Sequence, residues 1–391
     1  MTTKTKEYKT AMSFIIFLGV LSLFADMTYE GARSITGPFL AVLGANAAIV
    51  GFVAGFGELV GYGLRVVSGY WADKTARYWL IMTLGYICNL LVIPLLAFAS
   101  HWWMAAGLMI IERMGKAIRT PARDAMLSHA AHQTGLGWGF GLQEALDQTG
   151  ALIGPLLVAG VLYMNGSYQE SFALLLIPAL LALSTLALAY KFYPNPESLE
   201  IPNPDLTPAG IHSQRFWIYV AGASCIAAGF ADFPLIAYHF EKTQVFSPVW
   251  IPIAYAISMG ASGLSALLLG LWLDKYGLIV LVIVSLVSAF FSPLVFLTQG
   301  DWVWLGIVLW SIGIGAQESL MRAIVASMIP MNKRASAYGL FNMAYGIFWF
   351  VGSVTMGVLY DWSVLALVAF SIVIQLVAIP LLIIVMVKKQ N

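Results

Sequence analysis

GYWADK at residues 69–74 and GLWLDK at residues 270–275 are two copies of one pattern, 201 residues apart. Other stretches match in the same order on either side of them, at offsets that drift only from 206 to 197 residues. Phe24–Asp26 recurs as Phe230–Asp232, and Gly160–Tyr163 recurs as Gly357–Tyr360. We therefore expect a chain made of two related halves.

The composition places these halves in a lipid bilayer. Of the 391 residues, 60% are apolar and 10% are charged, whereas roughly 25% of the residues of a soluble domain are charged. So few charges could not cover the surface of a soluble protein of this length. The formal net charge of +1 argues against nucleic-acid binding, which needs a basic surface.

Motifs of catalysis and of cofactor binding are missing from the sequence. Neither an ATP-binding loop of the form G-x-x-x-x-G-K-[ST] nor the catalytic patterns H-E-x-x-H and G-x-S-x-G occur. The five histidines are not spaced as metal ligands, and Cys88 and Cys225 both lie within apolar stretches. We therefore expect no enzymatic activity, no cofactor and no metal site.

Membrane spans can be placed from length and composition. A helix needs roughly 20 apolar residues to cross about 30 Å of hydrocarbon. We expect twelve spans, near residues 12–40, 46–71, 78–99, 102–122, 139–164, 170–192, 215–239, 249–272, 277–298, 302–328, 336–360 and 363–387. With the N-terminus inside, most lysines and arginines fall on the cytoplasmic side, as the positive-inside bias requires.

The extended polar stretch Pro194–Gln214 divides these spans six and six. We expect an N-terminal six-helix bundle at residues 1–193, a cytoplasmic central loop at 194–214 and a C-terminal six-helix bundle at 215–391. An internal repeat in a helical membrane protein indicates a transporter with its site between the halves. The expected fold is an all-α membrane protein with twelve transmembrane helices in two pseudo-symmetric bundles.

The loop around the first repeated stretch, Gly69-x-x-x-Asp73-Lys74-x-x-Arg77, resembles the signature of the major facilitator superfamily. The sequence Asp-Lys-x-Gly at residues 274–277 looks like its second copy, so the resemblance covers the whole chain. It implies a monomeric transporter that works by alternating access, with these loops as cytoplasmic hinges and latches. The gating residues that we expect are Gly69, Asp73, Lys74, Arg77, Arg123, Asp274, Lys275, Glu318 and Arg322.

Gly150-x-x-x-Gly154-Pro155 in the fifth span resembles a motif associated, in this superfamily, with proton-driven antiporters that export their substrates. Glycines four residues apart let a neighbouring helix approach closely, and a proline locally bends its helix. Helix packing alone is the alternative interpretation. Asp147 lies on the same helix face as the two glycines, so we expect it to face the same neighbour.

Ionisable side chains inside the membrane need a partner or a function, because their burial is costly. Asp26, Glu30 and Arg33 lie within about 60° of one another around the first span. They form either an internal salt bridge or a protonatable site, and two acids facing one base favour the latter. The acids that we expect to carry protons are Asp26, Glu30, Glu58, Glu112 and Asp147.

A charged stripe, formed by Glu112, Lys116, Arg119 and Arg123, follows the fourth span to its cytoplasmic end. We interpret its lower half as a solvated face or an intracellular gate. Pro121 is expected to end or bend the helix there.

The substrate is expected to bind near the membrane midplane. Arg113 stands where the superfamily often has an embedded arginine, and the resemblance implies a role in proton transfer or substrate contact. For each aromatic candidate, packing in the core is the alternative. The candidate substrate-binding residues are Arg33, Arg113, Tyr29, Tyr62, Asp232, Tyr345 and Trp349.

The sequence thus predicts a secondary active transporter that exports a small organic molecule in exchange for protons. It is expected in a bacterial inner membrane, with both termini in the cytoplasm. The alternative is a proton symporter or facilitator that imports a small organic anion or zwitterion, with Arg33 and Arg113 binding its carboxylate or phosphate. A third hypothesis is a substrate-sensing receptor on the same fold, which binds a ligand without transmembrane flux.

Overall fold

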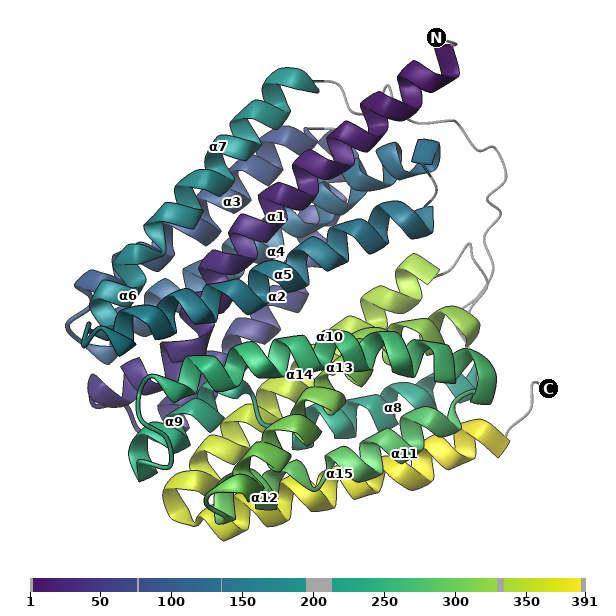
Figure 1. Ribbon diagram of the computed structural model, residues 1–391. Helices are drawn as coiled ribbons and strands as arrows, with labels where there is room; N and C mark the ends of the chain where they lie inside the picture. Colours follow the sequence, from purple (N-terminus) through teal and green to yellow (C-terminus); the bar gives the residue numbers. More distant parts are fainter. Residues whose placement is uncertain (1–2, 76, 135, 195–212, 329–333, 388–391) are drawn as a thin grey trace. The chain divides into compact units, whose positions relative to one another are not determined.

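The computed structural model describes residues 3–75, 77–134, 136–194, 213–328 and 334–387, and all regular structure in these ranges is helical (Figure 1). The helices before the central stretch are α1 (Thr3–Val42), α2 (Ala47–Thr75), α3 (Tyr78–Leu95), the 3-10 helix η1 (Leu96–Phe98), α4 (Trp102–Thr134), α5 (Leu136–Tyr163), α6 (Tyr168–Leu174) and α7 (Leu176–Phe192). Those after it are α8 (Gln214–Gly229), α9 (Phe233–Thr243), α10 (Trp250–Tyr276), α11 (Ile279–Ser288), α12 (Phe291–Leu297), α13 (Asp301–Met328), α14 (Arg334–Trp362) and α15 (Val364–Val387).

The chain divides into two compact units. The first consists of the described parts of Met1–Ile35, Val60–Asp205 and Pro248–Ala256, and the second of those of Thr36–Leu59, Leu206–Ser247 and Ile257–Asn391. α1, α2 and α10 therefore contribute to both units. The division into residues 1–193, 194–214 and 215–391 stays a prediction.

Eleven helical stretches within the described ranges are long and apolar enough to cross a membrane. They match eleven of the twelve predicted spans. The fourth span, expected at residues 102–122, corresponds to α4, whose six charged side chains make it less apolar. α4 contains Pro121 and continues to Thr134, because a proline can be accommodated inside a long helix by a kink. The chain is an all-α, multi-pass membrane protein.

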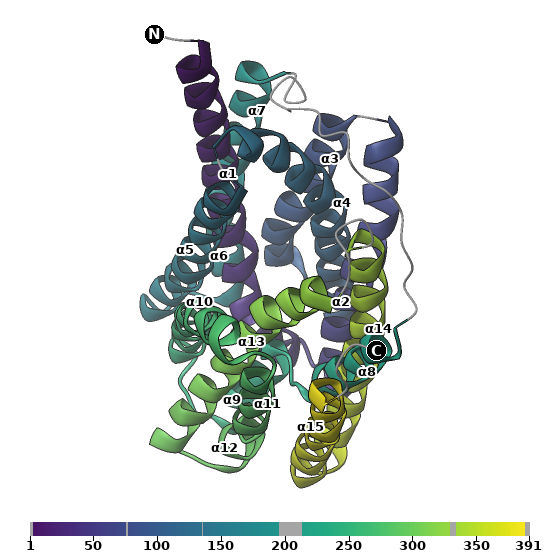
Figure 2. The same ribbon diagram turned by 90° about the vertical axis from the view of Figure 1, so that its right-hand side faces the viewer.

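Glycines set the spacing of the helices in the first unit, where α1 lies beside α5 and α3 beside α4 (Figures 1 and 2). A Cβ atom on Gly150 of α5 would lie 2.3 Å from the Leu23 backbone oxygen of α1. A Cβ atom on Gly115 of α4 would lie 2.3 Å from the Asn89 backbone nitrogen of α3. Only glycine permits backbones to approach so closely.

The second unit uses the same kind of contact between α8 and α14. A Cβ atom on Gly352 of α14 would lie 2.1 Å from the Ala228 backbone oxygen of α8. The seventh predicted span is interrupted, because α8 ends at Gly229 and α9 starts at Phe233. Pro234 stands in the first turn of α9, where its missing N–H leaves no hydrogen bond unmade.

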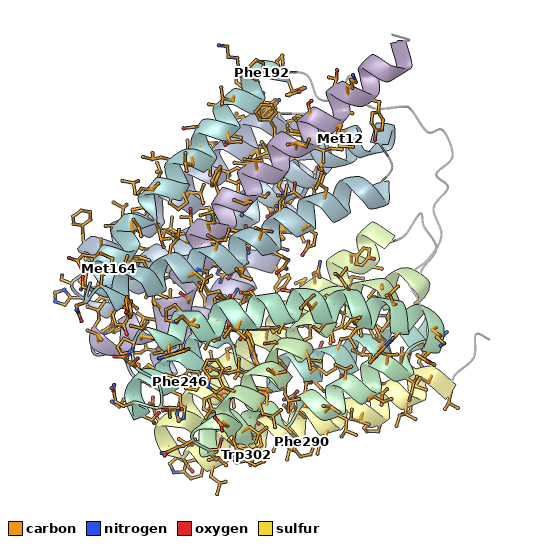
Figure 3. All side chains as sticks on the ribbon, viewed as in Figure 1. Met12, Met164, Phe192, Phe246, Phe290 and Trp302 are labelled. Carbon is orange, nitrogen blue, oxygen red and sulfur yellow. The ribbon has the colours of Figure 1, made fainter. Side chains whose placement is uncertain are left out.

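Large apolar side chains cover the outer surface of each unit. Met164 and Phe192 of the first unit are 81% and 60% exposed, and Phe290 and Trp302 of the second are 50% and 62% exposed (Figure 3). Surfaces of this kind are stable against lipid tails, and a tryptophan at a helix end is typical of the membrane interface.

Candidate functional site

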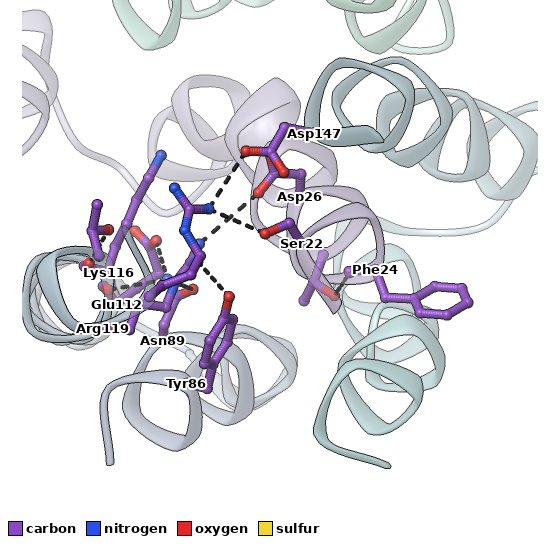
Figure 4. A network of polar contacts seen from close by, with 12 residues as sticks. Ser22, Phe24, Asp26, Tyr86, Asn89, Glu112, Lys116, Arg119 and Asp147 are labelled. Atoms are coloured by element: carbon purple, nitrogen blue, oxygen red, sulfur yellow. Dashed lines mark hydrogen bonds and ion pairs between the residues drawn. The ribbon is translucent and has the colours of Figure 1, made fainter. Parts of the chain in front are cut away.

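Buried charged side chains gather in the first unit, on α1, α4 and α5 (Figure 4). Asp26, Tyr29 and Glu30 of α1 are each at most 7% exposed. The polar face of α1 that the sequence predicts therefore points into this unit. The close approach of α1 to α5, which only glycine permits, holds that face against its neighbours.

Arg119 of α4 is the centre of one network, and its side chain is 1% exposed. Its Nε donates a hydrogen bond to Asn89 Oδ1 at 3.1 Å, and its Nη1 donates one to Tyr86 Oη at 3.0 Å. Its Nη2 lies 3.9 Å from Asp26 Oδ1 (Figure 4). Two neutral partners on α3 thus fix the guanidinium, and Asp26 contributes only a long ion pair.

The interpretation of the lower half of the α4 stripe as a solvated face is wrong for Arg119. The contact of Gly85 with α4 explains why, since a Cβ atom there would lie 2.6 Å from the Arg119 backbone nitrogen. With α3 this close, the Arg119 side chain lies between helices and cannot reach water. Tyr86 and Asn89, two polar side chains three residues apart in a helix without charged residues, are the sequence signal for this buried partner of Arg119.

A second network joins Asp147 of α5 to α1 and α4. Arg123 Nη1 lies 3.4 Å from Asp147 Oδ2 and donates a hydrogen bond to Ser22 Oγ at 3.1 Å. Gln143 Nε2 donates to Asp147 Oδ1 at 2.9 Å and also to Ser22 Oγ. Asp147 therefore faces α1, the helix against which Gly150 packs, and this expectation about its direction is confirmed.

Glu112 of α4 is held by α3 and by its own neighbour. Asn89 Nδ2 donates a hydrogen bond to Glu112 Oε1 at 2.7 Å, and Arg113 Nε lies 3.4 Å from Glu112 Oε2. Asn89 therefore bridges Glu112 and Arg119 through the two ends of its amide. Lys116 lies between them in the sequence, and its Nζ sits 3.7 Å from the centre of the Tyr29 ring, a cation–π contact.

Glu30 is bound from α10. The Tyr255 hydroxyl, which also belongs to the first unit, donates a hydrogen bond to Glu30 Oε2. Arg33, Lys116 and Arg113 all lie close enough to act on the Glu30 carboxylate electrostatically. An internal salt bridge within α1 is therefore only one part of the environment of Glu30.

Tyr255→Phe should lower the stability of the protein by about 1.5–3 kcal/mol, because it removes one buried hydrogen bond to a charged group. Thermal unfolding in detergent measures the effect. Tyr276→Phe on the same helix is the control, since Tyr276 is 56% exposed and the change should leave the unfolding temperature as it is. Equal unfolding temperatures for both variants would contradict the assigned role of Tyr255.

Two further candidates, Glu58 and Tyr62, are on α2. Glu58 is half-buried and belongs to the second unit. Tyr62 belongs to the first, with the Arg65 guanidinium carbon 5.3 Å from the centre of its ring. Their assigned roles in proton transport and substrate binding stay predictions.

The second unit holds the remaining substrate candidates. Asp232 is 3% exposed, and its Oδ1 accepts the Phe233 N–H at 2.9 Å, so it caps the start of α9. The Tyr345 hydroxyl donates a hydrogen bond to Gln317 Oε1 at 2.6 Å. The Trp349 ring lies 5.6 Å from the Tyr345 ring, centre to centre.

The expected gating residues are only partly covered. The side chains of Asp73, Asp274 and Arg322 lie outside the described residues. Lys74, Arg77, Lys275 and Glu318 are exposed. Gly69 of α2 faces Pro121 of α4, since a Cβ atom on it would lie 3.5 Å from the proline Cβ. Their gating roles stay predictions, and Pro155 lies inside α5 as expected.

The site contains several acids and cations, and its possible chemistry follows from them. Among the residues that the structure describes, no group of three or more His, Cys, Asp or Glu side chains could hold one. Buried carboxylates beside arginines can instead gain and lose protons, or bind a charged group of a substrate.

Comparison with known proteins identifies the family. The model described as Major Facilitator Superfamily matches residues 12–353. A protein of Mycobacterium tuberculosis (strain ATCC 25618 / H37Rv), described as uncharacterized, is 39% identical over 384 residues, which are 97% of this chain and 94% of the relative. The multidrug resistance protein MdtH of Proteus mirabilis (strain HI4320) is 30% identical over 119 residues, or 30% of each chain.

A solved structure shows the same fold. The crystal structure of the nucleoside transporter NupG superimposes with a TM-score of 0.74 at 15% sequence identity, covering 96% of this chain and 100% of that one. Secondary transporters of this family are embedded in the lipid bilayer and bind small-molecule substrates. Together with the all-helical, multi-pass architecture, the family match over nearly the whole length shows that this chain belongs to the Major Facilitator Superfamily.

Proposed function

We propose that this protein exports a small organic molecule across a bacterial inner membrane in exchange for protons, with Asp26 as the proton carrier. In this proposal it acts as a monomer with both termini in the cytoplasm. The observation that carries the proposal is the environment of Asp26, a buried carboxylate whose ion pair with Arg119 is long, while other groups hold that arginine.

The first argument concerns the partners of Arg119. Removing one member of a buried ion pair is normally costly, because the other charge is left uncompensated. Here Arg119 keeps its hydrogen bonds to Asn89 and Tyr86 whatever the charge on Asp26. The 3.9 Å separation between Arg119 Nη2 and Asp26 Oδ1 exceeds hydrogen-bond length. Protonation of Asp26 therefore breaks no short contact with Arg119.

The other buried acids are held more tightly. Asp147 accepts a hydrogen bond from Gln143 and lies beside Arg123, while Glu112 accepts one from Asn89 and Glu30 one from Tyr255. These contacts stabilise the charged carboxylates. We assign Glu30, Glu112 and Asp147 to relaying protons to and from Asp26, and we keep Glu58 as a further acid that carries protons.

The second argument concerns the position of Asp26 on α1. A Cβ atom on Gly150 would lie 3.0 Å from Asp26 Cβ, so Asp26 borders the contact between α1 and α5. A helix contact without free space responds to a change of charge at its edge, because close-packed elements shift between discrete arrangements. Proton binding at Asp26 thereby biases the equilibrium between access states.

The export direction rests on the sequence around this same contact. Gly150, Gly154 and Pro155 resemble a motif associated with proton-driven exporters, and the similarity of 30% of the chain to a multidrug resistance protein supports the same direction. For the substrate we assign contacts to Arg33, Arg113, Tyr29, Tyr62, Tyr345 and Trp349. Asp232 acts through α9, whose first turn it caps.

Transport by purified protein in liposomes tests this function. A panel of amphiphilic dyes and metabolites is first screened for compounds that raise the unfolding temperature, since a ligand stabilises the state that binds it. An acidic liposome interior should then drive uptake of such a compound against its gradient, and a proton ionophore should abolish the uptake. Uptake driven instead by an acidic exterior would indicate a symporter, and binding without flux would indicate a receptor. Either result contradicts the proposal.

A further inference from the structure

We propose that Asp361 is a gating residue of the transport cycle, which closes one end of the pathway by binding the N-terminus of α2 and must release it for that end to open. The inference rests on the transport function of the family and is independent of proton coupling and of the export direction.

The contact is a carboxylate on a helix N-terminus contributed by a distant part of the chain. Asp361 Oδ1 accepts the Ala47 N–H at 3.1 Å, and Oδ2 accepts the Ala48 N–H at 2.9 Å. The next N–H, of Ile49, is bound by the local side chain of Asn46 at 3.0 Å. The first N–H groups of a helix have no partner inside the helix, and its N-terminus carries partial positive charge. Asp361 therefore binds α2 with two charge-assisted hydrogen bonds.

Glycines bring the backbones of α2 and α14 close together next to this contact. Ser353, Gly357 and Asp361 follow one another at intervals of four along α14, and so lie on one helix face. A Cβ atom on Gly51 of α2 would lie 2.4 Å from the Ser353 backbone oxygen, and one on Gly357 would lie 2.5 Å from the Ala47 backbone oxygen. At these two glycines the helices meet backbone to backbone, and beside them the Phe52 and Phe56 rings of α2 pack against the Phe350 ring of α14. The interface is therefore tightly packed while Asp361 binds the start of α2.

The contact involves a helix whose contacts must change during the transport cycle. α2 is one continuous helix, yet Ala47–Leu59 belongs to the second unit and Val60–Thr75 to the first. Alternating access requires the units to rearrange, so a helix shared by both must exchange some of its contacts. On the predicted orientation, Asp361 and the start of α2 lie at the outer side of the membrane.

Release of this contact is chemically easy. Asp361 is exposed, and the hydrogen bond to Ala48 lies at the surface. Water can therefore replace both partners when the helices part, as it does for an exposed helix end. A buried ion pair at the same place would leave charges without solvent and would hinder opening.

Distances between spin labels measure this opening. We would label cysteines at positions 42 and 362, since Val42 and Trp362 are 59% and 79% exposed, after replacing Cys88 and Cys225 by serine. Asp361→Asn loses the negative charge and one of the two acceptor oxygens, so it should raise the ratio of long to short label distances about two- to fivefold, the size of effect of an acid near a helix N-terminus. Asp361→Glu should partly restore the short distances.

A matched control separates gating from stability. Asp301 is an exposed acid in the first turn of α13, predicted on the same side of the membrane. Asp301→Asn removes an acid from a helix N-terminus and should leave the distances and transport unchanged. A lower unfolding temperature for Asp361→Asn with unchanged distances and transport would overturn the proposal and leave Asp361 as a structural cap.

Glycine variants give an independent test. Gly51→Ala forces the α2–α14 surface apart and should shift the label distances in the same direction as Asp361→Asn. Gly61→Ala on the same helix meets no atom within 4 Å and should not shift them. Opposite behaviour of these two glycines would contradict the proposal, and Asp361→Asn remains decisive if Gly51→Ala does not fold.

Exchange of a dye identified in the screen, measured without a pH gradient, distinguishes this proposal from the proposed function. Asp361→Asn should slow the exchange severalfold, because every substrate passage requires the gate. One outcome is that Asp361→Asn slows exchange while a pH gradient fails to drive transport in the unmodified protein. That result would support the gating role of Asp361 and contradict the proposed proton coupling. Exchange at an unchanged rate in Asp361→Asn would overturn the gate and leave proton coupling untouched.

Discussion

Asp26→Asn should abolish transport driven by a pH gradient while leaving the exchange of substrate between the two sides intact. Asparagine has the shape of protonated aspartate but cannot release a proton. The variant therefore retains the neutral state that permits the change of access, and loses the coupling to protons. Uptake of one compound by liposomes, measured once with a pH gradient and once as exchange without it, separates the two activities.

Asp124→Asn is the matched control for this prediction. Asp124 also contacts an arginine of α4, with Arg123 Nη2 2.9 Å away, but its side chain is 44% exposed. We expect near-normal driven transport, because an exposed ion pair contributes little. If Asp26→Asn transports like the unmodified protein, Asp26 is not the carrier. If it loses exchange as well as driven uptake, Asp26 is structural.

Gly150→Ala should destabilise the protein by about 1–3 kcal/mol, the usual range for overpacking a well-packed interior, and should stop transport. The added methyl group would lie 2.3 Å from the Leu23 backbone oxygen and 3.0 Å from Asp26 Cβ. A backbone oxygen cannot move aside as a side chain can, so α1 and α5 must separate. Thermal unfolding in detergent and uptake by liposomes measure the two effects.

Gly160→Ala on the same helix gives the opposite expectation. A Cβ atom there meets nothing within 4 Å, and alanine is favoured over glycine inside a helix by about 1 kcal/mol. This variant should be as stable as the original protein or more so, with unchanged transport. Equal stability of the Gly150 and Gly160 variants would show that the α1–α5 contact is not tight.

Features that depend on a single helix could be predicted from the sequence. The apolar spans and the repeated stretches predicted the helical architecture, and the resemblance of the loop at residues 69–77 to the superfamily signature indicated the family. The period of the α-helix placed Asp26 and Glu30 on a common face, and both are buried in the first unit. The spacing of Gly150 and Gly154 predicted a close helix contact, and each glycine faces a backbone oxygen of α1.

The missed features depend on which helices become neighbours. Arg119 is buried because Gly85 and Gly115 bring α3 against α4, and helical periodicity contains no information about that pairing. The contacts of Tyr255 with Glu30 and of Asp361 with Ala47 join residues 225 and 314 positions apart. Such partners are brought together by tertiary packing. No local sequence pattern around either residue indicates which partner it has.

The proton movement itself tests the central claim most directly. Liposomes containing a pH-sensitive dye and the purified protein are given a gradient of a transported compound, with no initial pH difference. We predict that protons move in the direction opposite to the compound, and that Asp26→Asn shows compound exchange without proton movement. Proton movement in the same direction as the compound, or undiminished proton movement in Asp26→Asn, would contradict the account.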